Sequence, residues 1–554
     1  MKKNLLYNRF VIGSALVIII GISSCKKNKE ETANTSTTSP TSGTPKQLTL
    51  DSLFLYAKQI YLWNDAIPDY ATFNPRKYSS KSLDLDNYND ELYAISQLKI
   101  NPLTNQPYEY YGDGFPKYSF IDDLTQANPS ASANLKSADV DTEGNGNDVG
   151  IRPIYYLEGS TSGAYILFIT AVYPGSPAAA AGVQRGWVIT SVNGTAVVGK
   201  DYDTEHAAID AAIAGNSVTI SGYNYVDNVP FTKTLAKASY KSSPVYASSV
   251  ITRSGTKIGY LAFARFSALT NSDAPSDVNL DPVFSNFSGQ GITDLVVDLR
   301  YNGGGYINTA EYLADLIAPS SVAGKKMYSE IYNATMQAGK ATILANQPAL
   351  GSDGKVQYKN GSSGAIYTLA DESYATTDPS NNASFTKKGS LNTITNVVFI
   401  VSGNTASAAE LLINVLRPYV NVQIVGSTTY GKPVGFFPIV LQNRYQVYMS
   451  LFQTENANGF GGYYSGFVPA GTGTFGIPGI AMDDDPTYPF GDEREADLSA
   501  SLNLLVPGST SNQATVGVVN RAARPKALTI GGVRAANPRS EFTGMIANKR
   551  TIKK

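Results

Sequence analysis

The segment NVVFIVSGNTASAAELLINVL, residues 396–416, decides the fold of this chain. It opens with an uninterrupted apolar run, which is typical of a strand buried on both faces of a sheet. It closes with apolar residues at helical spacing, and a short polar turn ending in Ser407 lies between the two patterns. Because ligands of open α/β sheets bind at the carboxyl ends of strands, this turn is the first candidate site.

Similar apolar runs flank this segment along the chain. They are KIGYLAFARF (257–266), ITDLVVDLR (292–300) and VQIVGST (422–428), and the helical pattern TAEYLADLI (309–317) lies among them. Buried strands with interposed helices predict an α/β domain whose sheet is covered on both faces. We assign this domain to residues 245–505.

The strand at 292–300 ends in the sequence DLRYNGGGY, which carries Arg300, Asn302 and three glycines. Glycine permits backbone conformations and close approaches that other residues cannot adopt. Backbone N–H groups in this loop could therefore converge on a substrate oxygen. A plain turn that uses glycine for its geometry is the structural alternative.

Ser407 and Glu410 have the spacing of a capping box, so a purely structural cap explains both residues. The same position also places a hydroxyl at the positive end of a helix, with the Ala408 N–H beside it, where an oxyanion would be stabilised. Local sequence does not separate these two interpretations.

Lys432 is the only charged residue between Pro418 and Asn443, within the segment STTYGKPVGFF. An ordinary surface lysine is one interpretation, but apolar surroundings favour a neutral amine. To act as a base near pH 7, its pKa must fall roughly 3 units from about 10.4, through desolvation or a nearby like charge.

The composition excludes several classes of site. The chain has 554 residues with one histidine (His206), one cysteine (Cys25) and a net charge of −1. No zinc site with the usual three or four His/Cys ligands and no intramolecular disulfide can form, so we expect no metal site. The near-zero charge provides no field to attract nucleic acid. Nucleophilic catalysis would need His206 or a base of another type.

The N-terminus has the pattern of a secretory signal. Basic residues precede the apolar run FVIGSALVIIIGI (10–22), which is shorter than the roughly 20 apolar residues that a transmembrane helix needs. The following Ile-Ser-Ser-Cys resembles the lipobox of bacterial lipoproteins, which predicts a signal peptide over 1–25 and lipidation of Cys25. The polar, Ser/Thr-rich stretch 26–47 is expected to be a disordered tether.

Two further domains precede the α/β region. Mixed three and four spacings from Leu48 onward predict a helical domain over 48–135. Residues 148–238 alternate as strands around PGSPAAAAGVQRGWVITSVNG (174–194), which resembles a PDZ domain of the type attached to bacterial proteases. That resemblance implies that backbone N–H groups at Val149, Gly150 and Ile151 bind a peptide's C-terminal carboxylate while the peptide adds as a strand. His206 is then a groove or surface residue, and a domain that binds nothing is the alternative.

Together these segments resemble the carboxy-terminal processing peptidases, or tail-specific proteases, over about residues 48–505. The motifs that carry the resemblance are KIGYLAFARF, DLRYNGGG, SGNTASAAE, TYGK and the later GIPGIAMDDDP with its following GD. The resemblance implies a multidomain α+β protein with an N-terminal helical domain, a PDZ domain and an α/β catalytic core. Its residue assignments are Ser407 as nucleophile, Lys432 as general base, Ala408 with Gly303 or Gly304 as oxyanion hole, and Arg300 and Asn302 as residues that shape the loop.

One position departs from the family pattern. Some members place a glutamine four residues after the lysine, where it orients the amine, and here that residue is Phe436. Lys432 would then be held by another group, for which Thr429 is the candidate, or catalysis is weaker. The leading hypothesis is a cofactor-independent serine endopeptidase that cleaves polypeptides with accessible C-termini. The alternative is a catalytically weak or inactive peptide-binding lipoprotein.

The predicted location is the bacterial cell envelope, periplasmic or cell-surface, with the outer membrane contacted through the lipid anchor. The long Gly-, Ser- and Asn-rich run 318–390 suggests a lid or insertion over the site. Residues 506–554 have little apolar periodicity and many basic residues near the end, which predicts a solvated, partly disordered terminus.

Overall fold

The fold is described from a computed structural model over residues 39–112, 114–125, 140–158, 163–272, 274–351, 355–361, 363–509, 533–536 and 544–547. The predicted signal peptide, with Cys25, and most of the predicted tether lie outside these residues. Within them, no helix combines the length and the apolar character that a membrane span requires.

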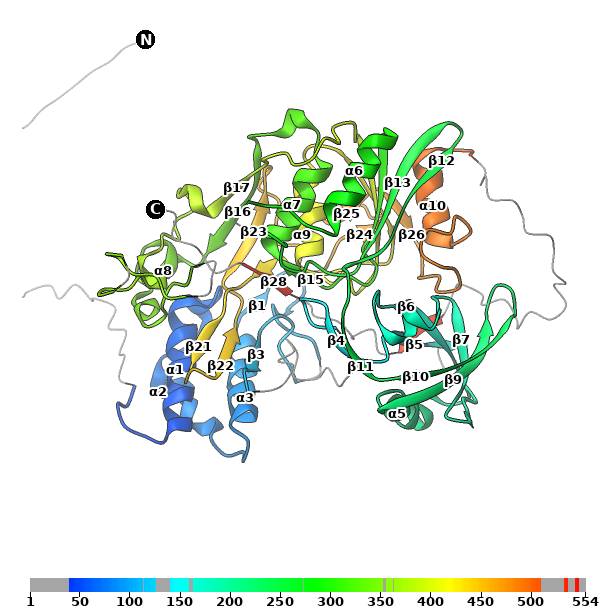
Figure 1. Cartoon of the computed structure of the whole chain (residues 1–554). Helices are drawn as coiled ribbons and strands as arrows, with labels where there is room; N and C mark the ends of the chain where they lie inside the picture. Colours follow the sequence, from blue (N-terminus) through cyan, green and yellow to red (C-terminus); the bar gives the residue numbers. More distant parts are fainter. Residues whose placement is uncertain are drawn as a thin grey trace, which may run out of the picture. The chain divides into compact units, whose positions relative to one another are not determined.

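The N-terminal region is mainly helical, as the spacing predicts (Figure 1). Its helices are α1 (Pro45–Ile60), α2 (Tyr70–Phe73) and α3 (Asp84–Ser96). The first helix begins three residues before the predicted start because Thr44 and Gln47 form a capping box. Its apolar face packs against the main hydrophobic core, which this region shares with the α/β domain.

The N-terminal region also contributes strands, which the helical prediction missed. They are β1 (Ile100–Asn101), β2 (Gln106–Pro107) and β3 (Phe120–Asp123). Strand β3 pairs antiparallel with β22 (Tyr445–Tyr448), which in turn pairs with β21 (Ile439–Leu441). The segment before the PDZ region is therefore bound to the part of the chain that follows Lys432.

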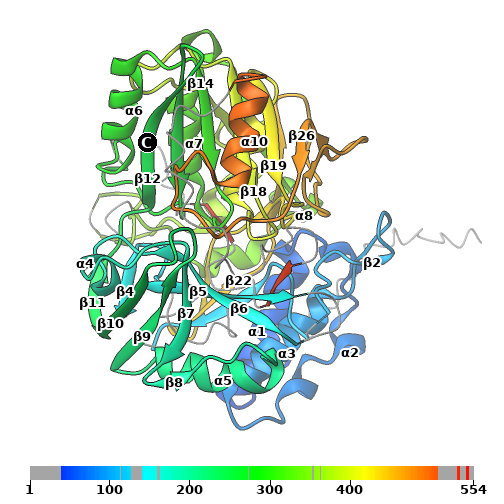
Figure 2. The same cartoon turned by 90° about the vertical axis from the view of Figure 1, so that its right-hand side faces the viewer.

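The PDZ region is an antiparallel sheet with two short helices (Figure 2). Its elements are β5 (Ile151–Glu158), β6 (Tyr165–Val172), α4 (Pro177–Ala180), β7 (Trp187–Val192), β8 (Thr195–Ala196), α5 (Tyr202–Ile213), β9 (Ser217–Asn224) and β10 (Pro230–Ala236). Ser176 caps α4, and Asn193 and Gly194 adopt positive φ in the turn after β7, as the motif predicts. Strands β4 (Asn145–Asp148) and β11 (Ala238–Lys241) pair where the chain enters and leaves this region.

The α/β domain is built on a six-stranded sheet. In spatial order its strands are β12 (Val245–Arg253), β13 (Thr256–Phe263), β14 (Asp294–Asp298), β18 (Asn396–Val401), β19 (Asn421–Gly426) and β26 (Gly479–Ala481). The pair β12–β13 is antiparallel and every other neighbouring pair is parallel. The loops after β14, β18 and β19, which carry the three candidate motifs, therefore leave the sheet at the same edge.

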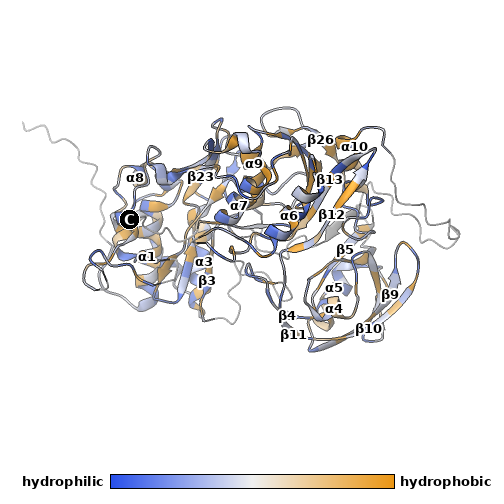
Figure 3. Cartoon of the chain, turned by 45° about the horizontal axis from the view of Figure 1, so that its top comes forward, coloured by the Kyte–Doolittle hydropathy of each residue, from blue (hydrophilic) through white to orange (hydrophobic). Residues whose placement is uncertain are grey.

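Helices cover both faces of this sheet. They are α6 (Leu280–Gln290), α7 (Ile307–Ile317) and α9 (Ala408–Leu416) on one face and α10 (Ala496–Leu505) on the other. Along β18, Val397 and Phe399 face the first layer, whereas Val398 and Ile400 pack with residues of α10. Figure 3 shows the apolar colour concentrated on the sheet strands and on α9, while α1 has one apolar and one polar side. The prediction of a doubly covered sheet is confirmed.

A second sheet holds the chain that follows Lys432. Its order is β17 (Asn382–Ser384), β16 (Lys326–Tyr332), β23 (Phe452–Asn456) and β20 (Val434–Gly435). The run 318–390 supplies β16 and β17 of this sheet, and also the short helix α8 (Ala334–Gln337). The remaining short strands are β15 (Gly304–Tyr306), β24 (Val468–Pro469) and β25 (Gly476–Ile477).

Two segments of the carboxy-terminal tail form strands. Val533–Ala536 (β27) pairs antiparallel with β5 of the PDZ region, and Gly544–Ile546 (β28) pairs parallel with β15 (Figure 1). The expectation of a solvated terminus is wrong for these two segments, because main-chain pairing to sheet edges needs no apolar periodicity in the sequence.

Candidate active site

Ser407 lies at the turn between β18 and α9, at the N-cap of the helix. Its side chain is fully buried, and its backbone has φ 60° and ψ −113°, a conformation that is strained for a residue with a Cβ. Its hydroxyl has no hydrogen-bond partner among the described residues. Buried unsatisfied groups and backbone strain gather at functional sites, so both features favour the catalytic interpretation of this serine.

Glu410, one turn into α9, connects the serine loop to the lysine loop. Its Oε2 accepts hydrogen bonds from the backbone N–H groups of Ser407 (2.9 Å) and Lys432 (2.8 Å). Its Oε1 accepts from Gly431 N (2.8 Å) and from the Thr429 hydroxyl (2.5 Å). One carboxylate thus fixes the two candidate catalytic residues to each other through their backbones. The capping role of Glu410 is therefore compatible with a catalytic role for Ser407.

Lys432 is completely buried, as the surrounding sequence indicates. Burial lowers the pKa of its amine to about 7, although the charges of Glu109 and Glu410 act in the opposite direction. The amine donates to the Tyr118 carbonyl (3.1 Å) and lies 4.4 Å from the centre of the Phe436 ring. The apolar ring at the position of the family's glutamine thus contributes to desolvation of the amine.

The N-terminal region supplies part of this environment. Besides the Tyr118 carbonyl, it contributes Lys117, whose amine donates to the Tyr464 carbonyl (2.9 Å). The charge of Lys117 lowers the pKa of Lys432 further. Glu109 is fully buried and accepts from the hydroxyls of Tyr61, Ser119 and Ser450. Sequence analysis missed these residues because more than three hundred positions separate them from Lys432.

The loop after β14 reaches the serine through Asn302. The backbone carbonyl of Asn302 accepts a hydrogen bond from Ala406 N (3.1 Å). In its side chain, Nδ2 donates to Phe263 O (2.9 Å) and Oδ1 accepts from Gly304 N (2.8 Å). Asn302 therefore shapes the loop, as the resemblance implies. Because the Gly304 N–H is already bonded, Gly303 is the remaining glycine candidate for the oxyanion hole in this arrangement.

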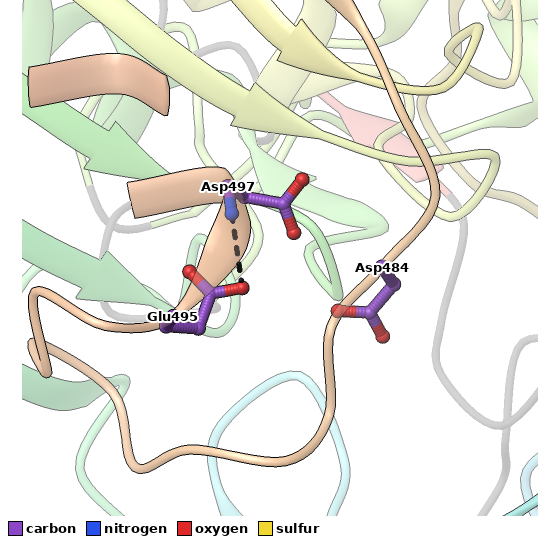
Figure 4. Close-up of side chains that lie close together, drawn as sticks. All are labelled: Asp484, Glu495 and Asp497. Atoms are coloured by element: carbon purple, nitrogen blue, oxygen red, sulfur yellow. Dashed lines mark hydrogen bonds between the residues drawn. The ribbon is translucent and has the colours of Figure 1, made fainter. Parts of the chain in front are cut away.

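Arg300 is fixed in a buried ion-pair network. Its Nη1 donates to Asp484 (2.9 Å), Glu495 (2.8 Å) and Asp497 (2.8 Å), and its Nε and Nη2 bind Asp298. Figure 4 shows the three carboxylates of the 484–497 segment gathered around one point. A guanidinium occupies this cluster, so its charge is balanced by the chain itself. The network ties the strand end before Asn302 to the start of α10.

Thr429 does not act as the sequence suggested. Its hydroxyl donates to Glu410 Oε1 (2.5 Å) and accepts from Phe467 N (2.8 Å), whereas the amine of Lys432 donates to Tyr118. The hydroxyl is satisfied by the carboxylate because Glu410 reaches across from α9. Thr429 therefore supports the lysine loop indirectly.

We expect Thr429→Val to lower the free energy of unfolding by about 2 kcal/mol, because it leaves the buried Phe467 N–H without its partner and removes one of the two hydrogen bonds to Glu410 Oε1. Urea denaturation measures the change. Thr429→Ser keeps the hydroxyl and serves as the control, which should lose less than half as much. A larger loss in Thr429→Ser than in Thr429→Val would show that the methyl group, not the hydrogen bonds, matters.

In the predicted carboxylate-binding loop of the PDZ region, a carboxylate of the chain itself, that of Asp148, already accepts a hydrogen bond from one of the backbone N–H groups. Gly150 adopts φ 82°, and its N–H donates to Asp148 Oδ1 (2.5 Å), which also accepts from the Tyr240 hydroxyl (2.9 Å). Val149 and Ile151 have buried side chains. His206 lies on α5, where its ring stacks on Tyr202. In this arrangement a peptide carboxylate would have to replace Asp148 at the Gly150 N–H.

Two family models match segments of this chain. Residues 257–461 match the model of peptidase family S41, and residues 168–219 match a PDZ domain. The chain therefore contains segments similar to peptidase family S41 and to a PDZ domain, as its motifs predict, and the resemblance to carboxy-terminal processing peptidases is confirmed.

Two curated relatives are named as C-terminal processing peptidases. The chain is 29% identical over 237 residues to the chloroplastic C-terminal processing peptidase of Tetradesmus obliquus, covering 40% of this chain and 48% of that protein. It is 25% identical to the carboxyl-terminal-processing protease of Synechocystis, covering 48% of this chain and 49% of that one. The chain thus spans about half the length of these curated relatives.

A solved structure supports the fold. The putative S41 protease of Bacteroides fragilis superposes with a TM-score of 0.51 at 21% identity, over 82% of this chain and 96% of that chain. At this level of identity the similarity concerns the fold alone.

Proposed function

We propose that this protein is a serine endopeptidase that cleaves unstructured polypeptides with accessible C-termini, with Ser407 as nucleophile and Lys432 as general base. The observation that carries the proposal is the Glu410 carboxylate, which bonds the backbones of both residues while burial lowers the pKa of Lys432 to about 7. A lysine with this pKa is partly neutral at physiological pH and can accept a proton.

Catalysis would proceed through an acyl-enzyme. The Ser407 hydroxyl attacks the scissile carbonyl while its proton passes to the neutral Lys432 amine, which then protonates the leaving amine. The Ala408 N–H has no intrahelical acceptor because it lies in the first turn of α9, so it is available to the developing oxyanion. Water then resolves the ester with Lys432 again as base. This chemistry needs no cofactor.

A serine-reactive fluorophosphonate probe tests the assignment directly. We expect covalent labelling of Ser407, identified by peptide mapping, with a rate that rises about tenfold from pH 6 to pH 8 as the Lys432 amine loses its proton. The same pH dependence should govern cleavage of casein. Ser407→Ala is the control for site identity. Failure of Ser407 to label would favour the catalytically inactive peptide-binding lipoprotein.

We also propose that the chain is lipid-anchored at Cys25 in the bacterial cell envelope, facing the periplasm or the cell surface. The basic, apolar and small-residue pattern before Cys25 supports this location. Metabolic labelling with an alkyne-bearing fatty acid should mark the wild-type protein and leave Cys25→Ser unmarked. The PDZ region would then present polypeptide ends to an enzyme confined to the membrane surface.

A further inference from the structure

The edge of β15, beside Ser407, is occupied by the chain's own carboxy-terminal tail. Strand β28 pairs parallel with β15 in the register Gly304 to Gly544 and Tyr306 to Ile546. The Gly544 N–H donates to the Gly303 carbonyl (3.0 Å), and the Ala547 N–H donates to the Phe436 carbonyl (3.0 Å). The tail therefore bonds through its main chain to both loops that flank the candidate dyad.

The tail passes very close to the nucleophile. A methyl group added at Gly304 would lie 2.4 Å from the Gly544 carbonyl oxygen and 3.0 Å from the Ser407 Cβ. Both groups thus border the same small space, which only a glycine at position 304, with φ 109°, leaves open. The run of glycines at 303–305 thus also lets an extended main chain approach the serine.

The tail is also buried where it binds. Ala547 is 7% exposed and belongs to the main hydrophobic core, and Ile546 packs against that core. Strand β28 contacts α9 and β20 as well as β15. A segment held on three elements around Ser407 excludes any other polypeptide from the same position.

The same tail also pairs with β5, the strand of the PDZ region to which a peptide is predicted to add. Strand β27 pairs antiparallel with β5, from Val533 opposite Glu158 to Ala536 opposite Tyr155. Its direction leads toward Gly150, as expected for a peptide that adds to this edge as a strand. Two separate edges, one in each domain, thus bind the main chain of one tail.

We propose that the sheet edge of β15, together with the Phe436 carbonyl, is a binding site for extended polypeptide main chain, and that residues 544–547 occupy it as an intramolecular inhibitor. Substrate pairs with β15 in the position of β28 and must displace the tail. The inhibitory consequence rests on the proposed peptidase function, whereas binding of the tail does not.

The full-length double variant Gly544→Pro with Ala547→Pro tests the inhibition, because proline removes both N–H donors. Two net hydrogen bonds correspond to a shift of up to about 30-fold between tail-bound and open forms, so casein cleavage should rise by up to that factor. Lys359→Met changes a surface side chain that pairs with Asp371, and it should cleave at the wild-type rate. Unchanged or lower cleavage in the folded double variant would overturn the inhibition.

Peptide binding tests the site without catalysis. A fluorescent peptide with the sequence of residues 541–550, EFTGMIANKR, should bind the double variant carrying Ser407→Ala, as measured by anisotropy. The same peptide with proline at the two positions has equal length and charge and should bind at least about tenfold more weakly. Equal binding of the two peptides would refute the main-chain site, whereas loss of cleavage with intact binding would count against the peptidase function alone.

Discussion

A Lys432→Met variant should lose cleavage and, at the same time, unfold at a higher urea concentration than the wild-type protein near neutral pH. Methionine fills the buried space but cannot accept the Ser407 proton, so cleavage should fall by about 10² to 10⁴-fold. The stability gain follows from burial, because the wild-type protein keeps an ionisable amine in a fully buried site.

The stability gain of Lys432→Met should decrease as the pH rises. The pKa of the amine is about 7 in the folded protein and 10.5 in the unfolded chain, so the unfolded chain binds more protons between these values. The resulting cost to the wild-type protein is about 5 kcal/mol at pH 6 and about 2 kcal/mol at pH 9. Methionine loses the bond to the Tyr118 carbonyl, which offsets about 1 to 3 kcal/mol at both pH values. The advantage of methionine should therefore shrink by about 3 kcal/mol from pH 6 to pH 9.

Lys359→Met provides the matched control, since the Lys359 side chain is 38% exposed and pairs with Asp371 at the surface. It should leave cleavage unchanged and alter stability by less than about 1 kcal/mol. A Lys432→Met variant that is equally destabilised at pH 6 and pH 9 would mean that the amine is protonated and solvated in the folded protein, which contradicts its role as base.

The parts of the fold that were predicted from sequence are those with a local signature. The apolar run before Ser407 and the helical spacing after it define β18 and α9 without further information. The PGSPA segment likewise combines a cap, a short helix and a turn within one stretch. Because parallel strands end at a common edge, these local features also placed Asn302, Ser407 and Lys432 in one neighbourhood.

What the sequence did not reveal depends on contacts between distant segments. Glu410 has a sufficient local explanation as a cap, and only the folded chain brings the backbone N–H groups of Gly431 and Lys432 to its two carboxylate oxygens. Tyr118 contributes a backbone carbonyl, which has no residue-type signature at all. Asp484 lies in the quoted GIPGIAMDDDP motif, whereas Glu495 and Asp497 belong to no motif. A buried arginine at a strand end nevertheless requires carboxylates to balance its charge.

Arg300 carries the second large effect. We expect Arg300→Met to lower the free energy of unfolding by about 3 to 5 kcal/mol, because it leaves Asp298, Glu495 and their neighbours buried without a counter-charge. The side chain is 1% exposed, so water cannot replace the lost partner. The positive charges of Arg300 and Arg185 hold the pKa of Asp484 well below its usual range, which shows how strongly this carboxylate depends on them.

Arg494→Met is the control that distinguishes the effect of burying an ion pair on stability from the effect of ion pairing itself. Arg494 also bonds a carboxylate through two nitrogens, to Asp492, but its side chain is 39% exposed, so its loss should change stability by less than about 1 kcal/mol. Urea denaturation of both variants at pH 7 gives the comparison. Similar small losses would mean that the buried carboxylates take up protons when the guanidinium is removed. In that case the Arg300→Met protein should gain stability relative to the wild-type protein as the pH falls from 7 to 5. The lowered pKa values of Asp484 and Glu495 keep the contribution of these carboxylates to wild-type stability constant over that interval.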